Sequence, residues 1–218
     1  MARIITRYFK FIGCAGAVTT GTLGTYIYYK SNQPAEAKLN LIFDLDETLI
    51  LADLVAKSQV DPVERSNKND PNNRTSPNTI AKFSNNRNQE SVYNVWYRPF
   101  AICTVRLLSK FNNIYLYTAA TKNYADRITD EMFPENIFQG KYYRDSLVNN
   151  KKDLSVVKTP GNNKILIDDR LKNNVLGQNF YHIPPFKGNF DFEMVKLFCV
   201  VVKYNLIGLP IDKDVKRF

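Results

Sequence analysis

The sequence has few of the residues that build disulfide frameworks, zinc sites or histidine-based catalysis. Its 218 residues include three cysteines and one histidine. Cys14, Cys103 and Cys199 are far apart and form no CxxC pair, so the spacing indicates neither a disulfide framework nor a zinc site. Any Ser–His or Cys–His mechanism would have to use His182. That residue lies in a strand-like run, where a structural or surface role is the more frequent one.

Acidic residues are scarce near the amino terminus. The net charge is +9, from 30 basic and 21 acidic residues. The first 40 residues carry five basic residues and one acid, Glu36, which makes +4 (5 − 1) and leaves +5 (9 − 4) for the remainder. The basic residues are scattered and accompany no recognition motif, so we expect no nucleic-acid partner. The apolar content of 44% is ordinary for a globular domain, and the length suffices for one domain with an appendage.

Residues 11–29 contain no charged side chain. As a helix this stretch would be about 28 Å long, close to the hydrocarbon thickness of a bilayer. Its glycines and alanines favour helix packing in membranes, and Tyr26, Tyr28 and Tyr29 suit a membrane interface. We therefore predict that residues 1–38 are a single-pass membrane anchor with a short linker. A mitochondrial presequence, alone or ahead of the anchor, and a cleaved secretory signal or loose tail are the alternatives.

Residues 39–218 are predicted to form one α/β domain. The predicted strands are residues 39–43, 92–97, 114–118, 164–169 and 181–184, and the predicted helices are residues 100–111, 124–133 and 190–206. Such alternation is typical of a Rossmann-like parallel sheet flanked by helices. Residues 57–91 are polar and lack periodicity, which predicts a long surface loop. No large cap domain is visible in the pattern.

Two carboxylates follow the first predicted strand. Asp44 and Asp46 stand two residues apart in the run Asp-Leu-Asp-Glu-Thr-Leu. Alternation along an extended chain puts them on the same side. Two acids held together repel each other unless a cation or a proton separates them. The spacing therefore indicates a divalent metal, or one carboxylate that attacks while the other does acid–base work.

Polar residues also end two later strands. Thr118 follows one of them, and Asp168 and Asp169 end another. The carboxyl ends of parallel strands share one edge of the sheet, where ligands bind. Lys152 lies just upstream of the last of these strands and can reach the same edge. Together with Thr48, the predicted set contains four carboxylates, two hydroxyls and one ammonium.

Six segments together resemble the haloacid dehalogenase superfamily, and within it the protein-phosphatase branch related to the phosphatases of the RNA polymerase II C-terminal domain. The segments are Asp44–Leu49, Trp96–Pro99, Tyr117–Ala120, Tyr143–Ser146, Lys152–Leu154 and Ile167–Arg170. They occur in the family order, and the resemblance covers about residues 39–205. One departure is Asp-Asp-Arg-Leu at 168–171, where family members often have Asp-Asn-Ser-Pro. Aspartate in place of asparagine keeps an oxygen ligand there.

The resemblance implies a phosphoserine/threonine protein phosphatase that depends on Mg²⁺. Asp44 would attack phosphorus and form an aspartyl phosphate. Asp46 would protonate the leaving oxygen and then activate water. Asp44, the backbone carbonyl of Asp46 and Asp169 would hold Mg²⁺, while Thr118 and Lys152 would bind the phosphate.

Two further residues take supporting roles in this resemblance. Asp168 would position Lys152 or a metal-bound water, and Thr48 would fix the loop after Asp46. The site is expected to be open because no large cap is predicted. An open site suits a phosphorylated protein better than a small metabolite.

Two other functions stay open. The amino-terminal segment resembles the anchors of two kinds of family member, the Dullard-type nuclear-envelope phosphatase and the receptor subunit of the mitochondrial presequence translocase. A non-catalytic receptor or scaffold is therefore one alternative, although a scaffold has no physical need for Asp44 and Asp46 together. A small-molecule phosphatase is the other. The predicted membrane is that of the nuclear envelope and endoplasmic reticulum, or the mitochondrial inner membrane.

Overall fold

The structure is a computed structural model that describes residues 25, 28–55, 78–84, 90–207 and 216–217. Most of the predicted membrane anchor and most of the predicted polar loop lie outside these residues. Within the described part of the chain, no helix is both long enough and apolar enough to span a bilayer.

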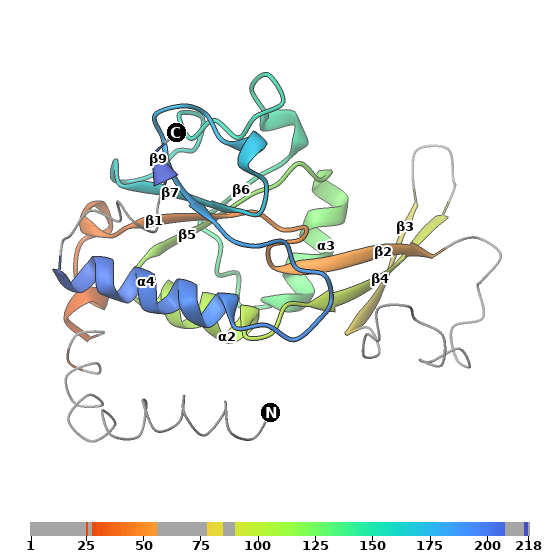
Figure 1. The fold of residues 1–218 in the computed structure, drawn as a ribbon, viewed down its shortest axis with the longest axis horizontal. Helices are drawn as coiled ribbons and strands as arrows, with labels where there is room; N and C mark the ends of the chain where they lie inside the picture. Colours follow the sequence, from red (N-terminus) through yellow and green to blue (C-terminus); the bar gives the residue numbers. More distant parts are fainter. Residues whose placement is uncertain (1–24, 26–27, 56–77, 85–89, 208–215, 218) are drawn as a thin grey trace.

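The described elements form two separate sheets with three α-helices (Figure 1). In chain order the elements, with η for a short 3-10 helix, are η1 (Ala35–Ala37), β1 (Asn40–Phe43), β2 (Ile50–Val55), β3 (Thr79–Ser84), β4 (Glu90–Tyr97), α2 (Ala101–Ser109), β5 (Asn113–Tyr117), α3 (Lys122–Met132), β6 (Gly140–Tyr142), η3 (Arg144–Ser146), β7 (Lys164–Asp168), η4 (Leu171–Asn173), β8 (Asn179–His182), α4 (Glu193–Ile207) and β9 (Lys216–Arg217). The larger sheet has the order β6-β5-β1-β7-β8-β9, and its strands are parallel except for β9. The predicted parallel α/β fold is confirmed.

Strand β1 lies at the centre of this sheet and is buried along its whole length. It pairs in parallel with β5 on one side and with β7 on the other. In this register Phe43 stands opposite Leu116 in β5 and opposite Ile167 in β7. All three strands therefore end at the same edge, and the residues that follow them emerge side by side.

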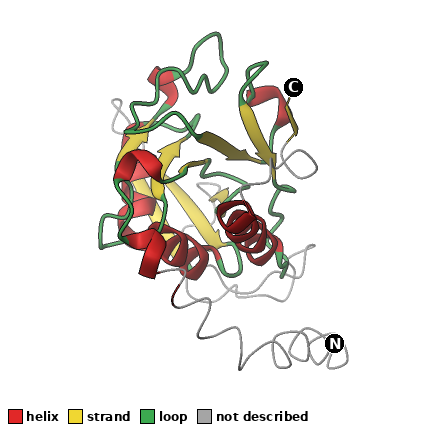
Figure 2. Ribbon diagram, turned by 90° about the vertical axis from the view of Figure 1, so that its left-hand side faces the viewer, coloured by secondary structure: helices red, strands yellow, loops and turns green. Residues whose placement is uncertain are grey.

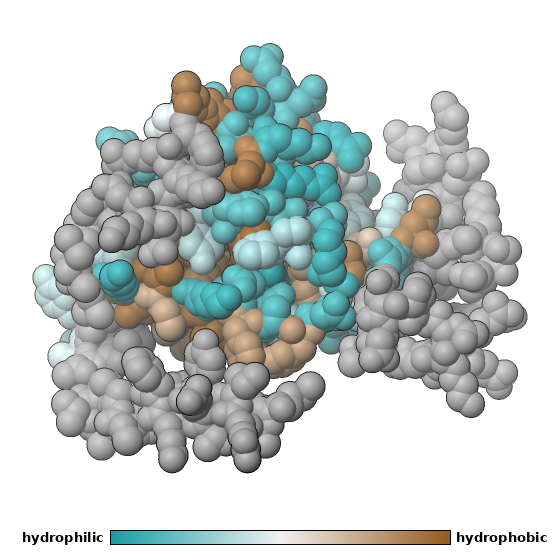
Figure 3. Space-filling view, viewed as in Figure 1, coloured by the Kyte–Doolittle hydropathy of each residue, from teal (hydrophilic) through white to brown (hydrophobic). Residues whose placement is uncertain are grey.

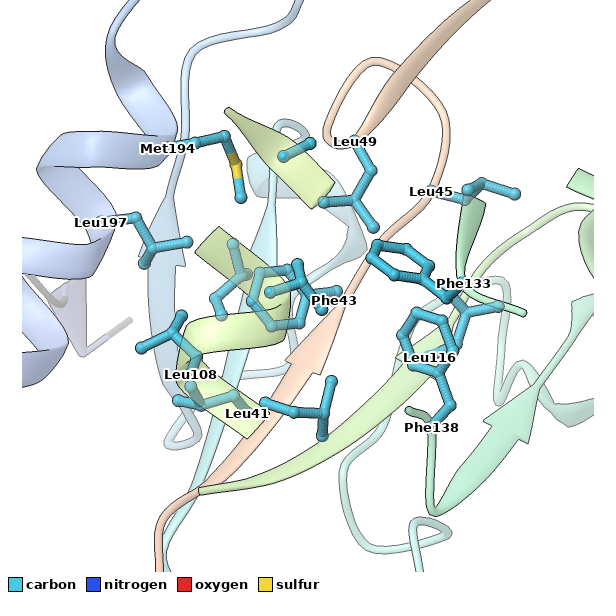
Figure 4. Close-up of a cluster of buried hydrophobic side chains, with 14 of the residues drawn as sticks. Leu41, Phe43, Leu45, Leu49, Leu108, Leu116, Phe133, Phe138, Met194 and Leu197 are labelled. Atoms are coloured by element: carbon cyan, nitrogen blue, oxygen red, sulfur yellow. The ribbon is translucent and has the colours of Figure 1, made fainter. Parts of the chain in front are cut away.

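The two faces of the sheet are covered differently. Leu41 and Phe43 of β1 enter the larger buried cluster, which also receives side chains from α2, α3 and α4 (Figure 4). Ile42 points to the opposite face, where Leu154 and Val157 from the segment before β7 help to close a smaller cluster. In Figure 2, helices lie below the strands of the sheet and long loops lie above them. Burial of each large side chain contributes about 1.5–3 kcal/mol, so this alternation fixes the register of β1.

The second sheet corrects the prediction for residues 57–91. Strand β3 lies inside this predicted loop, and β4 begins within it at Glu90. Strands β2, β4 and β3 form an antiparallel sheet that projects beyond the end of β1 (Figure 1). The predicted strand at 92–97 therefore belongs to this sheet and not to the parallel one. The physical reason is that strand propensity depends on cross-strand partners, and β4 supplies them to both neighbours.

The linker ahead of β1 packs against the amino edge of the parallel sheet. The side-chain amide of Asn113 donates to the carbonyl oxygen of Ala35 and to Oδ1 of Asn40, both at 2.9 Å. Gly161 approaches so closely that an added Cβ would overlap the carbonyl oxygen of Glu36. Ala35 and Glu36 of the linker thus contact the folded domain. Over the view of Figure 3, hydrophilic side chains cover most of the described surface of that domain.

Candidate active site

Four charged side chains meet where β1 and β7 end. Asp44 follows β1, Asp168 is the last residue of β7, and Asp169 follows it. The ammonium of Lys152 comes from the segment before β7 and lies 2.7 Å from Oδ1 of Asp44 and 2.5 Å from Oδ2 of Asp168. All four residues are buried. The structure thus brings together residues that lie more than 100 positions apart in the chain.

One ammonium among three carboxylates leaves an excess of negative charge. Carboxylate oxygens of Asp44, Asp168 and Asp169 lie within 4.8 Å of one another. Burial raises the pKa of Asp44 to about 8, and the charge of Asp168 adds to this although Lys152 opposes it. Burial disfavours the charged form of Lys152, yet Asp44 and Asp168 outweigh that effect and raise its pKa. The cluster therefore holds a proton or needs a further cation.

The oxygen donors of this cluster fit Mg²⁺, which prefers carboxylate oxygens and retains several waters. Asp168 is already engaged, because its Oδ1 accepts the backbone N–H of Arg170 at 2.7 Å and its Oδ2 accepts Lys152. The side-chain amide of Asn173 donates to both oxygens of Asp168, at 3.0 and 3.1 Å. Asp44 and Asp169 are therefore the carboxylates best placed to bind a cation.

Asp46 lies outside this group of three and is held by a tyrosine. The hydroxyl of Tyr124, on α3, donates to Oδ1 of Asp46 at 2.7 Å. Burial raises the pKa of Asp46, although the Tyr124 hydrogen bond and the charge of Lys152 oppose the shift. A raised pKa is what a carboxyl group needs to donate a proton near neutral pH. Burial, followed by the charge of Asp46, also raises the pKa of Tyr124, which keeps its phenol a donor.

The two predicted threonines are buried at the same edge. Thr118 follows β5, and its Oγ1 accepts the backbone N–H of Ala120 at 3.1 Å. A hydroxyl that accepts one hydrogen bond can still donate another, so Thr118 can bind an anionic oxygen. The hydroxyl of Thr48 donates to Oδ1 of Asp169 at 3.3 Å. This bond links the loop after β1 to the loop after β7.

Arg98 holds the loop that carries Asp46 in place through an ion pair and two hydrogen bonds. Its Nε lies 3.0 Å from Oδ2 of Asp191, and its Nη1 donates to the carbonyl oxygen of Thr48 at 3.1 Å. A third bond runs from Nη2 to the carbonyl oxygen of Pro184 at 2.7 Å. Arg98 is buried, and these contacts fix the loop after β1 to the segment after β8.

Glu47 ties the loops around the site together at the surface. Its φ of 58° is in the left-handed region, which is uncommon for a residue with a side chain. Its carboxylate lies 3.0 Å from Nη2 of Arg170 and 3.2 Å from Nζ of Lys187. The loop after β1 is therefore joined to the loop after β7 and to the segment after β8.

The sequence prediction missed three residues that shape the site. Tyr124 donates to Asp46 across the fold, Asn173 donates to Asp168 from five residues further along the chain, and Glu47 lies within the predicted motif but had no predicted role. No local pattern marks a single tyrosine in a helix or an asparagine in a loop. The one available signal was their position shortly after the motifs at 117–120 and 167–170.

Comparisons with known proteins identify the family and the fold of the chain. The sequence model of the NLI interacting factor-like phosphatases matches residues 39–205. No curated protein matches the chain. A fission yeast RNA polymerase II CTD phosphatase Fcp1 variant bound to beryllium fluoride has a similar structure, with 18% identity and a TM-score of 0.57 over 88% of this chain and 57% of that one.

A second solved structure, of Fcp1 described as an essential RNA polymerase II CTD phosphatase, has 21% identity and a TM-score of 0.56. It is matched over 88% of this chain and 55% of its own. At these identities the likeness shows a shared fold. The chain spans little more than half the length of these two structures.

Proposed function

Because the chain belongs to the NLI interacting factor-like phosphatase family, we propose that it is a Mg²⁺-dependent phosphoserine/threonine protein phosphatase. The observation that carries this proposal is the ammonium of Lys152, buried between Asp44 and Asp168. Lys152 neutralises only part of the carboxylate charge, and Nε of Arg170 lies 3.6 Å from Oδ2 of Asp169. A buried cation beside several carboxylates suits a site that receives a phosphoryl group and a metal ion together.

Asp44 is the nucleophile in this proposal. One of its oxygens attacks phosphorus, the bond from phosphorus to the seryl or threonyl oxygen breaks, and an aspartyl phosphate forms. Lys152 and the hydroxyl of Thr118 bind the phosphoryl oxygens as charge develops on them. When Mg²⁺ is bound by Asp44, Asp169 and the backbone carbonyl of Asp46, it supplies positive charge that favours the ionised form of Asp44 and neutralises phosphate oxygens.

Asp46 acts as the acid and then as the base. In the first step it gives its proton to the leaving seryl or threonyl oxygen. In the second step a water attacks phosphorus, Asp46 takes the water's proton, and the bond between phosphorus and Asp44 breaks to release phosphate. The raised pKa of Asp46 supports the first role, since its carboxyl keeps a proton at higher pH than an exposed aspartate does.

The inserted sheet beside the site supports a polypeptide substrate. Strand β2 follows the Asp46 loop directly and pairs with β4, and Leu54 near the far end of β2 is 62% exposed. Tyr93 of β4 packs edge-on against Tyr124, with ring centroids 5.6 Å apart. An exposed sheet next to the acid can contact residues on either side of a phosphorylated serine or threonine.

The decisive experiment compares the parent chain with Asp44→Asn on a phosphoserine peptide, with Mg²⁺ and with EDTA. We expect Asp44→Asn to lower kcat/KM by roughly 10³-fold or more, because it removes the nucleophile. EDTA should have a comparable effect on the parent. Asp130→Asn, an exposed acid on α3 that pairs with Lys141 outside the site, is the matched control and should leave the rate unchanged. Equal rates in the parent and Asp44→Asn would rule out the enzyme.

The alternative function is a non-catalytic receptor subunit of a mitochondrial presequence translocase, suggested by the amino-terminal segment. Binding of presequence peptides by a chain that hydrolyses no phosphate ester would favour it. A rate on sugar or nucleotide phosphates far above that on phosphopeptides would instead favour a small-molecule phosphatase.

We also propose that residues 1–38 tether the domain at 39–218 to a membrane through residues 11–29. The uncharged stretch between basic flanks supports this proposal. Imaging of a tagged chain with and without residues 1–30 tests it and distinguishes the nuclear envelope and endoplasmic reticulum from mitochondria. A shortened chain that keeps the distribution of the full one would contradict the anchor.

A further inference from the structure

We propose that Tyr124 is a positioning residue for Asp46, which it holds in the orientation from which the carboxyl gives its proton to the leaving oxygen. This role rests on the proposed function, because it requires Asp46 to be the acid. It adds a residue that lies outside the motifs and belongs to a different element of the fold.

The hydrogen bond selects which oxygen of Asp46 carries the proton. The phenol of Tyr124 donates to Oδ1 at 2.7 Å. A protonated carboxyl group has one O–H and one carbonyl oxygen, and the oxygen that accepts a hydrogen bond is the carbonyl one. Oδ2 is therefore the oxygen that bears the proton. Without the phenol, either oxygen could bear it and the carboxyl could rotate.

Tyr124 is itself held firmly on both sides. It lies near the start of α3, which is fixed to the core by the buried side chains of Ala125 and Ile128. From the other side Tyr93 of the inserted sheet packs edge-on against its ring. Asp46, by contrast, lies in a half-buried turn between β1 and β2. A side chain on a rigid helix thus orients a carboxyl group on a loop, as precise sites require.

The same helix offers a matched hydrogen bond outside the site. The hydroxyl of Tyr143 donates to Oδ1 of Asp126, on α3, at 2.6 Å. Asp126 also lies 2.7 Å from Lys122 and 3.3 Å from Lys141, so this bond belongs to an ion-pair network that joins α3 to β6. Both bonds join a tyrosine to an aspartate and involve α3. Only the bond to Asp46 reaches a reacting group.

The experiment compares Tyr124→Phe with Tyr143→Phe in the full chain with Mg²⁺. Each variant is assayed on a phosphoserine peptide, whose alkoxide leaving group needs a proton, and on p-nitrophenyl phosphate, whose leaving group needs almost none. We expect Tyr124→Phe to lower kcat/KM on the peptide by about 10–100-fold, part of what general acid catalysis contributes. On p-nitrophenyl phosphate kcat/KM should hardly change. Tyr143→Phe should leave the ratio of the two rates as it is in the parent.

The ratio of the two substrates within one preparation does not depend on how much of it is folded. A Tyr124→Phe variant with an unchanged ratio would therefore overturn the positioning role, even if both rates fell. A double-mutant cycle provides the second measurement. Once Asp46→Asn has removed the acid, adding Tyr124→Phe should lower the peptide rate no further, and a full additional loss would overturn the proposal.

Failure of this role and failure of the proposed function are separate outcomes. If Asp44→Asn is inactive while Tyr124→Phe keeps the parent ratio, the chain is a phosphatase whose acid does not need the tyrosine. If Asp44→Asn is as active as the parent, the proposed function itself fails.

Discussion

The two edges of the parallel sheet both bury polar side chains, but they do so with different chemistry. At the amino edge, neutral amides bond to one another. Asn113 donates to Asn40 at 2.9 Å, Gln139 donates to Asn113 at 3.0 Å, and Asn40 donates to the carbonyl oxygen of Gly161 at 3.0 Å. At the carboxyl edge, Asp44 and its neighbours share one ammonium.

The difference shows how a buried polar network can serve stability or ligand binding. In the amide network each donor meets an acceptor inside the protein, so the network is complete by itself. In the charged network, Lys152 cannot neutralise Asp44, Asp168 and Asp169 together, and burial raises the pKa of Asp44 and of Asp169. Binding of a cation and an anion would therefore stabilise the charged network more than the amide network.

Among the changes that compare the two edges, replacement of Lys152 should have the largest effect. We expect Lys152→Met to lower kcat/KM on a phosphoserine peptide by about 10²–10³-fold, because it removes a preorganised cation from the phosphoryl site. Lys164, at the amino edge, is the matched control, since its Nζ donates to the carbonyl oxygens of Leu154 and Val157 at 2.9 and 2.7 Å. Lys164→Met should lower stability and leave kcat/KM unchanged. Equal losses of activity in the two variants would remove the distinction between the edges.

The free energy of unfolding should depend on pH through the carboxyl edge. The pKa of Asp44 is raised in the folded chain, from 3.8 to about 8. Between these values the folded state binds more protons than the unfolded state, so metal-free stability falls as pH rises, by about 1 kcal/mol per pH unit. Urea unfolding at several pH values measures this slope. Asp44→Asn and added Mg²⁺ should each reduce this pH dependence of the free energy of unfolding. An unchanged slope in Asp44→Asn would mean that another group causes it.

Removal of one amide at the opposite edge should affect stability alone. Asn113→Ala leaves Oδ1 of the buried Asn40 without its donor, whereas the exposed side-chain amide of Gln139 can bond to water. Each unsatisfied group costs about 1–3 kcal/mol, so we expect a loss in this range by urea unfolding. The kcat/KM of the folded variant should match that of the parent. A drop in kcat/KM with stability unchanged would show that the edges are coupled.

The smallest effect is expected from Gly161→Ala. The new Cβ would overlap the carbonyl oxygen of Glu36, so the linker must move away from the amino edge. We expect a loss of about 1 kcal/mol, since a surface segment can shift. Hydrogen exchange at the backbone amides of Ala37 and Lys38 should become faster, because their bonds to Pro34 and Ala35 belong to the docked linker. Unchanged exchange would mean that the linker tolerates the methyl group.

The sequence predicted the carboxyl edge better than any other part of the fold. Asp44 and Asp168 each follow or end a fully apolar strand, and parallel strands place their carboxyl ends together. The role of Asn173 could not be predicted in this way. Its bond to Asp168 depends on the path of the loop after β7, and loop paths are set by packing that no short pattern encodes.

The prediction from the sequence was wrong for the inserted sheet. Residues 79–84 alternate only weakly and lie in a polar region, so they predict a loop when taken alone. They form β3 because β4, with Val92, Tyr93 and Val95, gives them a partner. Strand formation there is a property of the pair. Tyr93 and its contact with Tyr124 could be found only once that pairing was known.

The central place of β1 has a consequence for how the protein acquires its activity. Asn40 pairs with Asn113 and with Lys164, which are 73 (113 − 40) and 124 (164 − 40) residues further along the chain. Contacts between such distant residues form slowly, because a long loop must close first. A growing chain therefore carries Asp44 long before β7 delivers Asp168 and Asp169. Until the last of these strands is in place, the nucleophile has no complete site, so catalytic competence arrives together with the finished domain.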